Sequence, residues 1–417
     1  MFTLTGFSSD NRSRFPTWRR PARPQPARHL PCAITAAALL ATGAVPTDAR
    51  AQAVVENSLS SAWTATPEWT LEEDLRIWGP PDGYLGDVDA VAADSRGNIY
   101  ILDGTSQEIQ VFDADGGFVR TLGGRGQGPG EFREALGPAI AQGDTLWVAD
   151  GLAPRYSIFA PDGTFIRTRV RRMASGMLTE RCTIPPDGSY MEWWTRLPRV
   201  ERSEDMDNND LRHHHPIRVS ADGGKQDTLP YLEFTRQLAD LPSVGSRRPV
   251  WFGPTLQRAL GCRDDVWFAP SNEYRVYRRT LGGDTTVVFT LEGVRPAAVD
   301  EDDRDEVRAT FERYPELASA SALMADHLRA LPENKPVIAG LFVDGAGHVF
   351  VVPETSRVDA GTAIDVFRED GVFLGRASVP QAVRINPGRA YATGDYLLFA
   401  GESEAGEPYV TRLRIRR

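Results

Sequence analysis

A repeat with a period of 47 residues restricts the fold of this chain more than any other feature of its sequence. Asp103 ends one run of apolar residues, and Asp150 ends the next run 47 residues later. The strands that follow keep the same offset, since Phe112 is matched by Phe159. A period of this length, built from short apolar runs with Gly and Asp turns between them, is typical of a radial array of four-stranded sheets.

Weaker copies of the repeat extend over the rest of the chain. Short runs within residues 187–223, 265–277 and 345–371 supply a third, a fourth and a fifth copy. The sixth copy is incomplete, because residues 396–415 provide only its later strands. Residues 69–77 have the character of an outer strand without the three strands that should precede it.

We therefore expect an all-β fold, a six-bladed β-propeller with four-stranded antiparallel blades over residues 69–417. The N-terminal strand is expected to close the last blade, because that pairing removes two open sheet edges. A small helical insertion is predicted at residues 297–334, where Asp300 can cap a helix that carries Val307 and Phe311 at helical spacing. Its two helices are expected to lie over the blade rims, either as a cover for apolar strand ends or as a lid.

The best-matched part of the repeat has a recognisable motif. Residues 91–103 place an Asp-Ser-Arg-Gly-Asn turn before an Ile-Tyr-Ile-Leu-Asp strand, and residues 109–113 and 126–132 complete the pattern. Over residues 87–170 the chain resembles NHL-repeat six-bladed propellers. Members of that superfamily range from protein-binding and RNA-binding modules to metal-dependent lactonases and lyases, so the resemblance implies an architecture and leaves the activity open.

The start of the chain has the pattern of a secretory signal. Arginines precede an uncharged stretch rich in Ala and Leu at residues 30–47, and Ala49-Arg50-Ala51 has the small-x-small form that signal peptidase cuts after. We predict a signal peptide at residues 1–51, a linker at residues 52–68, and an exported product, periplasmic or extracellular. No apolar run of about 18 residues follows Ala51, so no transmembrane segment is expected in the mature chain.

The charge balance argues against nucleic acid as a partner. The chain has 47 Lys and Arg against 57 Asp and Glu, which gives a net charge of −10. A nucleic-acid-binding surface needs clustered positive charge. The partner is therefore expected to be a protein or a small-molecule ligand of unknown identity.

The predicted connections differ in length between the two ends of the ring. The turns between first and second strands, and between third and fourth strands, are tight, as at residues 94–98 and 113–117. The connections at the other end are long and varied, and they include residues 123–134, the polar stretch 195–216 and the helical insertion. Insertions that collect on one side of a repeat array usually mark its binding side, so we expect the contact surface there.

Charged and aromatic residues near this end are candidates for binding. They are Asp103, Arg125, Glu131, Arg133, Asp150, Arg155 and Trp194. The two aspartates recur at one blade position, where they could contact a ligand or accept backbone N–H bonds in a turn. The arginines could bind a carboxylate or phosphate, or pair with neighbouring acids. One residue of the Trp193-Trp194 pair is expected to be less buried, because successive strand side chains face opposite ways, and it could stack on a ligand.

Metal ligation has weak support in the sequence. His213, His214 and His215 adjoin several acidic residues in the polar stretch, but successive side chains of an extended chain alternate in direction, which prevents their convergence. His348 aligns with the turn residue Asn98, and a structural role is expected for it. We expect no cofactor for a binding module, whereas an enzyme of this architecture would need calcium or zinc.

Two cysteines remain after the predicted cleavage. Cys182 and Cys262 lie near the first strands of the third and fourth copies, and an oxidising compartment would permit a disulfide between them. Sequence spacing does not establish the Cα separation that such a bond requires.

The sequence thus favours an exported, NHL-like propeller that acts as a binding or interaction module through the end with the long connections. The alternative is a divalent-metal-dependent hydrolase or lyase, similar to a lactonase, with its site in the axial channel. No catalytic residues are identified, and enzyme activity stays an open question at this point.

Overall fold

The computed structural model describes the repeat region with several gaps. The described residues are 54–60, 68–170, 189–196, 211–222, 224–261, 265–313, 320–354, 363–380, 383 and 385–417. All of them belong to the compact unit Ala51–Arg417. The predicted signal peptide and both cysteines of the predicted disulfide lie outside the described residues.

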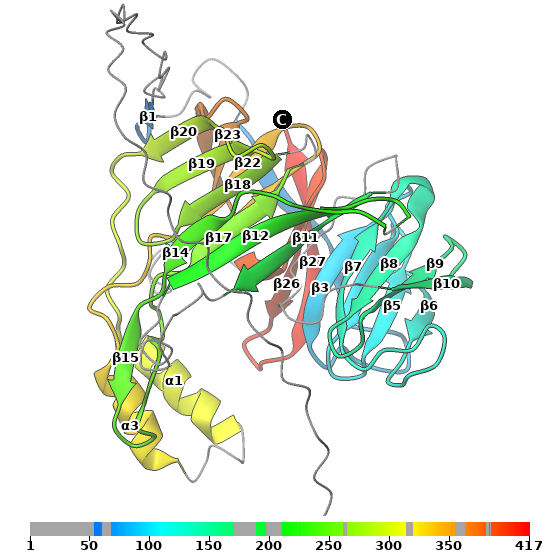
Figure 1. Cartoon of the computed structure of the whole chain (residues 1–417), viewed down its shortest axis with the longest axis horizontal. Helices are drawn as coiled ribbons and strands as arrows, with labels where there is room; N and C mark the ends of the chain where they lie inside the picture. The colour runs from blue at the N-terminus through cyan, green and yellow to red at the C-terminus, as the bar shows by residue number, and fades with distance from the viewer. Residues whose placement is uncertain are drawn as a thin grey trace, which may run out of the picture. The chain divides into compact units, whose positions relative to one another are not determined.

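Small antiparallel sheets follow one another along the chain (Figure 1). Blades 1 to 3 contain β3 (Val88–Ala93), β4 (Ile99–Asp103), β5 (Glu108–Phe112) and β6 (Phe118–Gly123), then β7 (Ala135–Ile140), β8 (Leu146–Asp150), β9 (Arg155–Phe159) and β10 (Phe165–Val170), then β11 (Tyr190–Arg196), β12 (Leu211–Val219), β13 (Gln226–Thr228) and β14 (Leu232–Thr235). In blade 3, β13 and β14 both pair with β12. Pro230 lies between them, where its missing N–H interrupts the ladder.

The second half of the chain continues the same plan. Blades 4 to 6 contain β17 (Leu256–Leu260), β18 (Asp265–Pro270), β19 (Arg275–Thr280) and β20 (Thr285–Leu291), then β21 (Ile338–Val343), β22 (His348–Pro353), β23 (Ala363–Arg368) and β24 (Phe373–Ser378), then β25 (Ala390–Ala392), β26 (Tyr396–Glu402), β27 (Pro408–Arg416) and β2 (Thr70–Ile77). Two single 3-10 turns, η2 (Gln142–Asp144) and η4 (Pro387–Arg389), lie beside first strands.

The apolar runs of the sequence are explained by burial on both faces of each strand. In β4, Ile99 and Ile101 pack toward blade 6, whereas Tyr100 and Leu102 pack toward blade 2. Each of these four side chains is at most 3% exposed. A strand covered on both faces has no polar side, so it appears in the sequence as a continuous apolar run.

Apolar clusters join every pair of neighbouring blades. Six clusters of buried side chains occur among the described residues, and each of them spans two adjacent blades. One of them joins the last blade to the first, since Ile77 of β2 packs with Val91 of β3. The sheets therefore form a closed ring, and the fold is a six-bladed β-propeller, as the repeat predicts.

The closure is made by the strand that the sequence predicted. β2 pairs with β27 from Thr70 opposite Arg416 to Ile77 opposite Val410. The carboxylate of Asp74 accepts hydrogen bonds from the guanidinium groups of Arg412 and Arg414, each with an Nε to carboxylate distance of 2.8 Å. The strand that directly precedes blade 1 thus becomes the outer strand of the last blade.

Glycines in the tight turns allow neighbouring blades to approach closely. Gly371 has a φ of 86°, and a Cβ at this position would lie 3.0 Å from the Cβ of Phe289 on β20. Gly163 has a φ of 87°, and its Cβ would lie 2.9 Å from side-chain atoms of Leu122 on β6. Both turns have the sequence Asp-Gly-x-Phe, so the recurrence of this motif records a blade-to-blade contact as well as a turn.

Part of the predicted linker belongs to blade 4. Strand β1 (Val54–Asn57) pairs in parallel with β20. The side-chain amide of Asn57 donates to the carbonyls of Thr290 and Gly371, both at 3.0 Å, and its oxygen accepts from the N–H of Phe373 at 2.9 Å. This one side chain therefore fastens blade 4 to blade 5.

The described part of the predicted helical insertion contains two helices, α1 (Glu301–Arg313) and α3 (Ser321–Arg329). They were expected to lie over the blade rims, but they pack with a hairpin formed by β15 (Leu238–Leu241) and β16 (Ser246–Pro249), beside which they appear in Figure 1. The N–H of Ser243 donates to Asp326 of α3 at 2.8 Å, and the ring of His327 lies against Trp251. Neither helix is long and apolar enough to cross a bilayer, and the same holds for every helix in the described ranges.

We predict that the Asp74 contact stabilises the closed ring. Asp74→Ala should lower the free energy of unfolding by about 2 kcal/mol, because it removes two charge-assisted hydrogen bonds and leaves the buried Arg412 without this carboxylate. Glu72→Ala is the matched control on the same strand, since its pair with Arg416 is more than half exposed and should be worth less than about 0.5 kcal/mol. Chemical denaturation of both variants makes the comparison; equal effects would contradict this role.

Candidate functional site

The long connections of blades 6, 1 and 2 meet in one continuous surface, which we call the loop face. It consists of residues 78–87, 103–107, 123–134 and 150–155, which follow or precede strand ends on the side opposite the tight turns. Hydrogen bonds link each of these segments to the next, as described below. Six of the seven predicted binding residues lie on it.

Asp103 fixes the first two segments of the loop face to each other. Its buried carboxylate accepts hydrogen bonds from the backbone N–H groups of Gly86 at 2.8 Å, Thr105 at 2.9 Å, Ser106 at 3.3 Å and Asp87 at 3.4 Å. Two of these donors belong to the connection from blade 6, and two belong to the turn after β4. The aspartate is thus used as a turn-stabilising acceptor, one of the two roles that the sequence left open.

Asp150 repeats this arrangement one blade further on. Its fully buried carboxylate accepts from the N–H groups of Arg133, Leu152 and Ala153, each at 3.1 Å, and from that of Glu134 at 3.3 Å. The equal spacing of the two aspartates in the sequence therefore reflects equal tasks in consecutive blades. Backbone N–H groups of the propeller therefore already engage both carboxylates.

Arg155 and Glu131 hold the glycine-rich connection in place. Arg155 donates to the carbonyls of Gln127 and Glu131, both at 2.9 Å, and its Nε lies 3.5 Å from Asp150. The carboxylate of Glu131 accepts from the N–H of Gly128 at 2.8 Å. Both residues thus hold the backbone of this connection; the Arg155 side chain is largely buried, whereas Glu131 is exposed.

Arg125 and Arg133 are the exposed cations of the loop face. Arg125 donates to the carbonyl of Thr105 at 3.4 Å, and Arg133 donates to that of Leu152 at 3.3 Å. Both contacts cross from one segment to the next. Trp194, the seventh predicted residue, lies on β11 opposite His215, but its side chain is outside the described residues.

Large apolar side chains on the loop face were missed by the sequence analysis. Tyr84 is 81% exposed, Leu152 is 58% exposed and Trp78 is 43% exposed. The segment that carries Tyr84 and Trp78 is closed by a hydrogen bond from the N–H of Leu85 to the carbonyl of Trp78 at 3.1 Å, and the ring of Trp78 lies edge-on to Tyr409 at 5.1 Å. The available signal was the Trp-Gly-Pro-Pro sequence at residues 78–81, which falls in a connection between two predicted strands.

Between blades 6 and 1, Arg389 forms ion pairs with Asp87 at 2.7 Å and with Asp89 at 3.2 Å. Burial raises the pKa of Asp89; the charge of Arg389 opposes this shift, and the charges of Asp87 and Asp103 add to it. Arg389 therefore offsets part of the negative charge of Asp87, on the loop face, and of the neighbouring Asp89.

The three adjacent histidines lie in strand β12 and not in the expected loop. Their side chains alternate in direction, as predicted: the rings of His213 and His215 lie against Tyr231, whereas His214 contacts Arg258 through Nδ1. Nowhere in the described ranges do three His, Cys, Asp or Glu side chains gather as a metal site would require.

Burial lowers the pKa of His214 to about 3, and the nearby charges of Arg258, Arg212, His215 and Arg236 act in the same direction. The ring of His214 is therefore neutral at pH 7.

His348 has the structural role that its alignment with Asn98 predicted. Its Nδ1 lies 2.8 Å from the carboxylate of Asp344, just as the side chain of Asn98 donates to Asp94 at 2.7 Å. Both aspartates also accept backbone N–H bonds across their turns.

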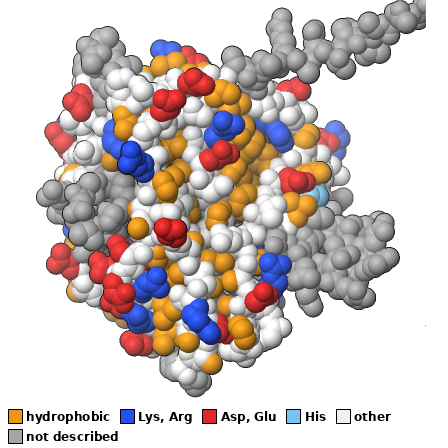
Figure 2. Space-filling model, turned by 90° about the vertical axis from the view of Figure 1, so that its left-hand side faces the viewer, with side chains coloured by type: hydrophobic (Ala, Val, Ile, Leu, Met, Phe, Trp, Pro, Cys, Tyr) orange, Lys and Arg blue, Asp and Glu red, His pale blue; other side chains and the backbone are white. Residues whose placement is uncertain are grey.

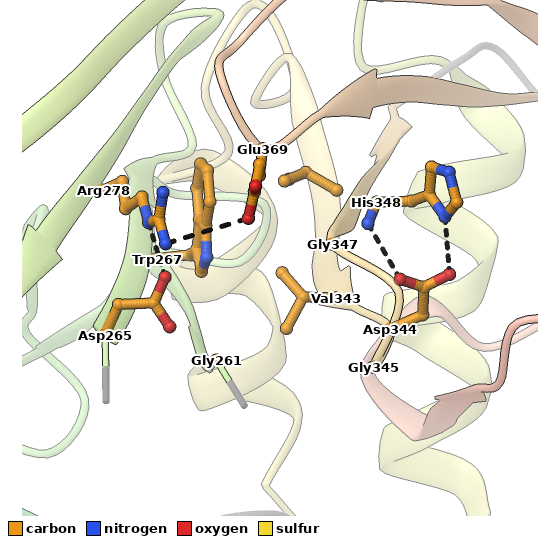
Figure 3. A pocket seen from close by; sticks show the side chains of 11 residues that line it. Gly261, Asp265, Trp267, Arg278, Val343, Asp344, Gly345, Gly347, His348 and Glu369 are labelled. Atoms are coloured by element: carbon orange, nitrogen blue, oxygen red, sulfur yellow. Dashed lines mark hydrogen bonds and ion pairs between the residues drawn. The ribbon is translucent and has the colours of Figure 1, made fainter. Parts of the chain in front are cut away.

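A small cleft lies near this turn, between blades 4 and 5 at the end with the tight turns (Figure 3). Arg278 bonds to Asp265 at 2.5 Å and approaches Glu369 to 4.0 Å across it. The cleft has a volume of about 20 Å³, which is enough for a single water molecule. We treat this cleft as part of the blade interface.

A larger space lies near the axis, and we call it the axial cavity. Its volume is about 140 Å³, and the first strands β17, β21 and β25 contribute to its wall together with Trp193 of β11. Among its described lining residues none is a carboxylate or a histidine, and the one charged residue is Arg258. The described wall therefore offers no set of oxygen or nitrogen ligands for a hard cation.

Comparisons with known proteins agree on the architecture. A family model described as a 6-bladed beta-propeller, DUF5128, matches residues 82–150. One similar structure is a Bacteroides fragilis protein, whose name proposes that it is exported. It is 13% identical, with a TM-score of 0.50 over 88% of this chain and 100% of that chain. A duf4221 family member from Bacteroides vulgatus is 9% identical, with a TM-score of 0.51 over 84% of this chain and 99% of that chain.

A gluconolactonase from Xanthomonas campestris is 14% identical, with a TM-score of 0.45 over 86% of this chain and 94% of that chain. Comparison with curated protein sequences gives no match. At these identities the similarities show the six-bladed propeller fold and nothing more specific.

We predict that Asp103 stabilises the loop face. Asp103→Ala leaves four backbone N–H groups without their acceptor and should lower the free energy of unfolding by about 2 to 3 kcal/mol. Asp162→Ala, in an exposed tight turn where the carboxylate accepts from Thr164, should have a much smaller effect. Denaturant unfolding of the two variants tests this, and an Asp103 effect as small as the control would refute it.

The low pKa of His214 predicts a pH dependence of stability. Below about pH 6.5 the unfolded chain takes up a proton at this ring while the folded chain does not until about pH 3, so stability is lost as the pH falls through this window. Between about pH 7.5 and pH 5 the wild type should lose about 1 kcal/mol more than His214→Gln, a figure reduced for the partial exposure of the ring. Identical pH profiles in thermal unfolding would contradict the assignment.

Proposed function

We propose that this protein is an exported, NHL-like propeller that binds a partner protein through the loop face. The observation that carries the proposal is the presence of Tyr84, Trp78 and Leu152, all substantially exposed, on a surface whose backbone is fixed by buried carboxylates. Aromatic residues displayed at low conformational cost are typical anchors of protein interfaces, and arginine is the charged residue most often found beside them. Arg133 donates to the carbonyl of Leu152, and Arg125 lies on the same loop face.

The charge of the molecule as a whole also favours a protein partner over a polyanion. Figure 2 shows acidic and basic side chains intermixed around hydrophobic ones on the side of the molecule that it draws. The overall net charge is −10. Binding by shape and apolar anchors needs no field of one sign.

Export is supported by the signal pattern of residues 1–51 and by the name of the similar Bacteroides fragilis protein. A divalent-metal-dependent hydrolase or lyase is the less favoured alternative. Its site would need several oxygen or nitrogen ligands on the axis, and the described wall of the axial cavity provides Arg258 instead. The loop-face carboxylates Asp103 and Asp150 are already engaged by backbone N–H groups.

The proposal predicts that loss of one aromatic side chain abolishes partner capture. Tyr84→Ala should reduce recovery of a partner from the extracytoplasmic fraction of the source cells at least about tenfold, because a central aromatic anchor contributes about 2 kcal/mol or more to binding. Ile166→Ala is the matched control, since Ile166 is 50% exposed but lies on the outer strand β10. Quantitative mass spectrometry of captured proteins compares the two variants with the wild type.

A partner protein whose recovery falls with Tyr84→Ala and persists with Ile166→Ala supports the proposal. Equal recovery of all captured proteins by wild type, Tyr84→Ala and the Tyr84→Ala, Leu152→Ala double variant would reject it. Circular dichroism and thermal unfolding confirm that the variants are folded.

A further inference from the structure

The outer edge of blade 4 carries a strand that does not belong to the repeat. Strand β1 lies beside β20 in Figure 1 and pairs with it in parallel, from Val54 opposite Val288 to Asn57 opposite Leu291. Outer strands β6, β10 and β24, by contrast, each pair with one strand only among the described ones. We call the surface that holds β1, formed by residues 288–292 and 371–373, the strand groove.

The side chains of β1 alternate between the strand groove and the solvent. Val55 packs against the apolar cluster that joins blades 4 and 5, and Asn57 is partly buried. Val54 is 39% exposed, and Glu56 is exposed as well. A peptide that adds to a sheet edge gains affinity from backbone hydrogen bonds and specificity from pockets for alternate side chains. β1 is bound in this manner.

The pocket for Asn57 is specific for an amide. Its Nδ2 donates to the carbonyls of Thr290 and Gly371, both at 3.0 Å, and its Oδ1 accepts from the N–H of Phe373 at 2.9 Å. The N–H of Glu292 donates to the backbone carbonyl of Asn57 at 2.8 Å. An ionised aspartate has the same shape but donates no hydrogen bond, so it would leave two carbonyls without their donor. The strand groove therefore recognises asparagine at this position.

The blades hold this pocket in place, because the groups that bind Asn57 are backbone atoms of blades 4 and 5. The ring centres of Phe289 and Phe367 lie 4.3 Å apart across the blade interface, and Phe373 lies 5.1 Å from Phe367. A Cβ at Gly371 would lie 3.0 Å from that of Phe289, so the two blades are in close contact at this turn. A segment that replaces β1 would therefore meet a prepared surface, which lowers the entropic cost of its binding.

The attachment of β1 to the propeller contributes much of its binding. The strand has four residues, and a pairing of this length is marginal in isolation. Residues 58–69 connect it to β2, and a tether of this kind gives it an effective concentration of about 1 mM at the strand groove. A segment of another chain can take its place when that chain is itself held nearby.

We propose that the strand groove is a peptide-binding site, which residues 54–57 occupy in cis, and that its partner is an extended segment of another protein. The segment carries a β-branched residue in the place of Val55 and an asparagine in the place of Asn57. Residues 54–57 then act as an intramolecular competitor that closes the site until such a segment displaces them. The strand groove shares no residue with the loop face, so either proposal can fail without the other.

A fluorescent peptide with the sequence of residues 52–59 tests the site. Asn57→Ala in the predicted mature chain, residues 52–417, weakens the segment in cis and leaves every residue of the strand groove unchanged. We expect this variant to bind the peptide saturably at about 0.1 mM in fluorescence polarisation. The wild type should bind it at least about fivefold more weakly, because β1 competes. Circular dichroism confirms that the variant is folded.

Changes in the peptide locate the binding. Asn57→Asp in the peptide should weaken binding at least about tenfold, because the carboxylate offers no donors to the two carbonyls. Val55→Lys should weaken it by a similar factor, because Val55 packs against the apolar cluster. Val54→Lys is the matched control on the exposed side of the strand, and it should change the affinity by less than about twofold.

Peptide binding to Asn57→Ala that depends on the asparagine and on Val55, and that tolerates Val54→Lys, establishes the site. The absence of saturable binding, equal binding by wild type and variant, or equal affinity for the Asn57→Asp peptide would each overturn it. A wild-type dimer in sedimentation velocity that Asn57→Ala abolishes would make a second copy the occupant and reject a different protein in that role. If Asn57→Ala does not fold, Val55→Ala, which also weakens the segment in cis, replaces it in the same measurements.

Discussion

Face-to-face packing of apolar blade surfaces is the constraint on which the rest of this structure depends. Every strand in a blade core must bury both faces, and a sheet can do so only if it has a neighbour on each side. A ring satisfies this condition for all blades at once, provided that the last blade meets the first. Here that meeting is made by Thr70–Ile77, which pairs with Pro408–Arg416 and carries Ile77 into the cluster shared with blade 1.

The rigidity of the loop face follows from the same architecture. Because the blades are fixed relative to one another, an aspartate at the end of a second strand can accept N–H bonds from its own turn and from the incoming connection. Asp103 and Asp150 do this in consecutive blades. Tyr84 and Trp78 are therefore displayed on a backbone that is already ordered, which lowers the entropic cost of binding through them.

The parts of the fold that repeat could be predicted, and the parts that occur once could not. The offset between Asp103 and Asp150, the Asp-Gly-x-Phe turns and the unpaired outer strand at residues 69–77 carried enough information for the blade number and the ring closure. Strand β1 has only four residues and no periodicity, and it is a strand because β20 offers it an edge. The β15–β16 hairpin that contacts α3 is also made of two four-residue strands outside the repeat, and no sequence pattern predicted it.

The candidate site divides in the same way. Asp103 and Asp150 were predicted to recur at one blade position, with the other four charged residues near them at the same end of the ring. The six do lie together, but their hydrogen-bond partners are mostly backbone groups that sequence spacing does not reveal. The exposed apolar residues were missed because the sequence alone does not distinguish an exposed tyrosine, such as Tyr84, from a tyrosine buried in the core. The contact between His214 and Arg258 joins two blades and depends on a register that no local pattern encodes.

Native-state hydrogen exchange measures the ring closure most directly. If β2 is an integral strand of blade 6, its amides should exchange only through global unfolding, with the same opening free energy as those of β26 in the same sheet. Exchange of Thr70–Ile77 through a local opening that is about 3 kcal/mol or more easier than the opening of β26, with the other blades still protected, would contradict the closed ring.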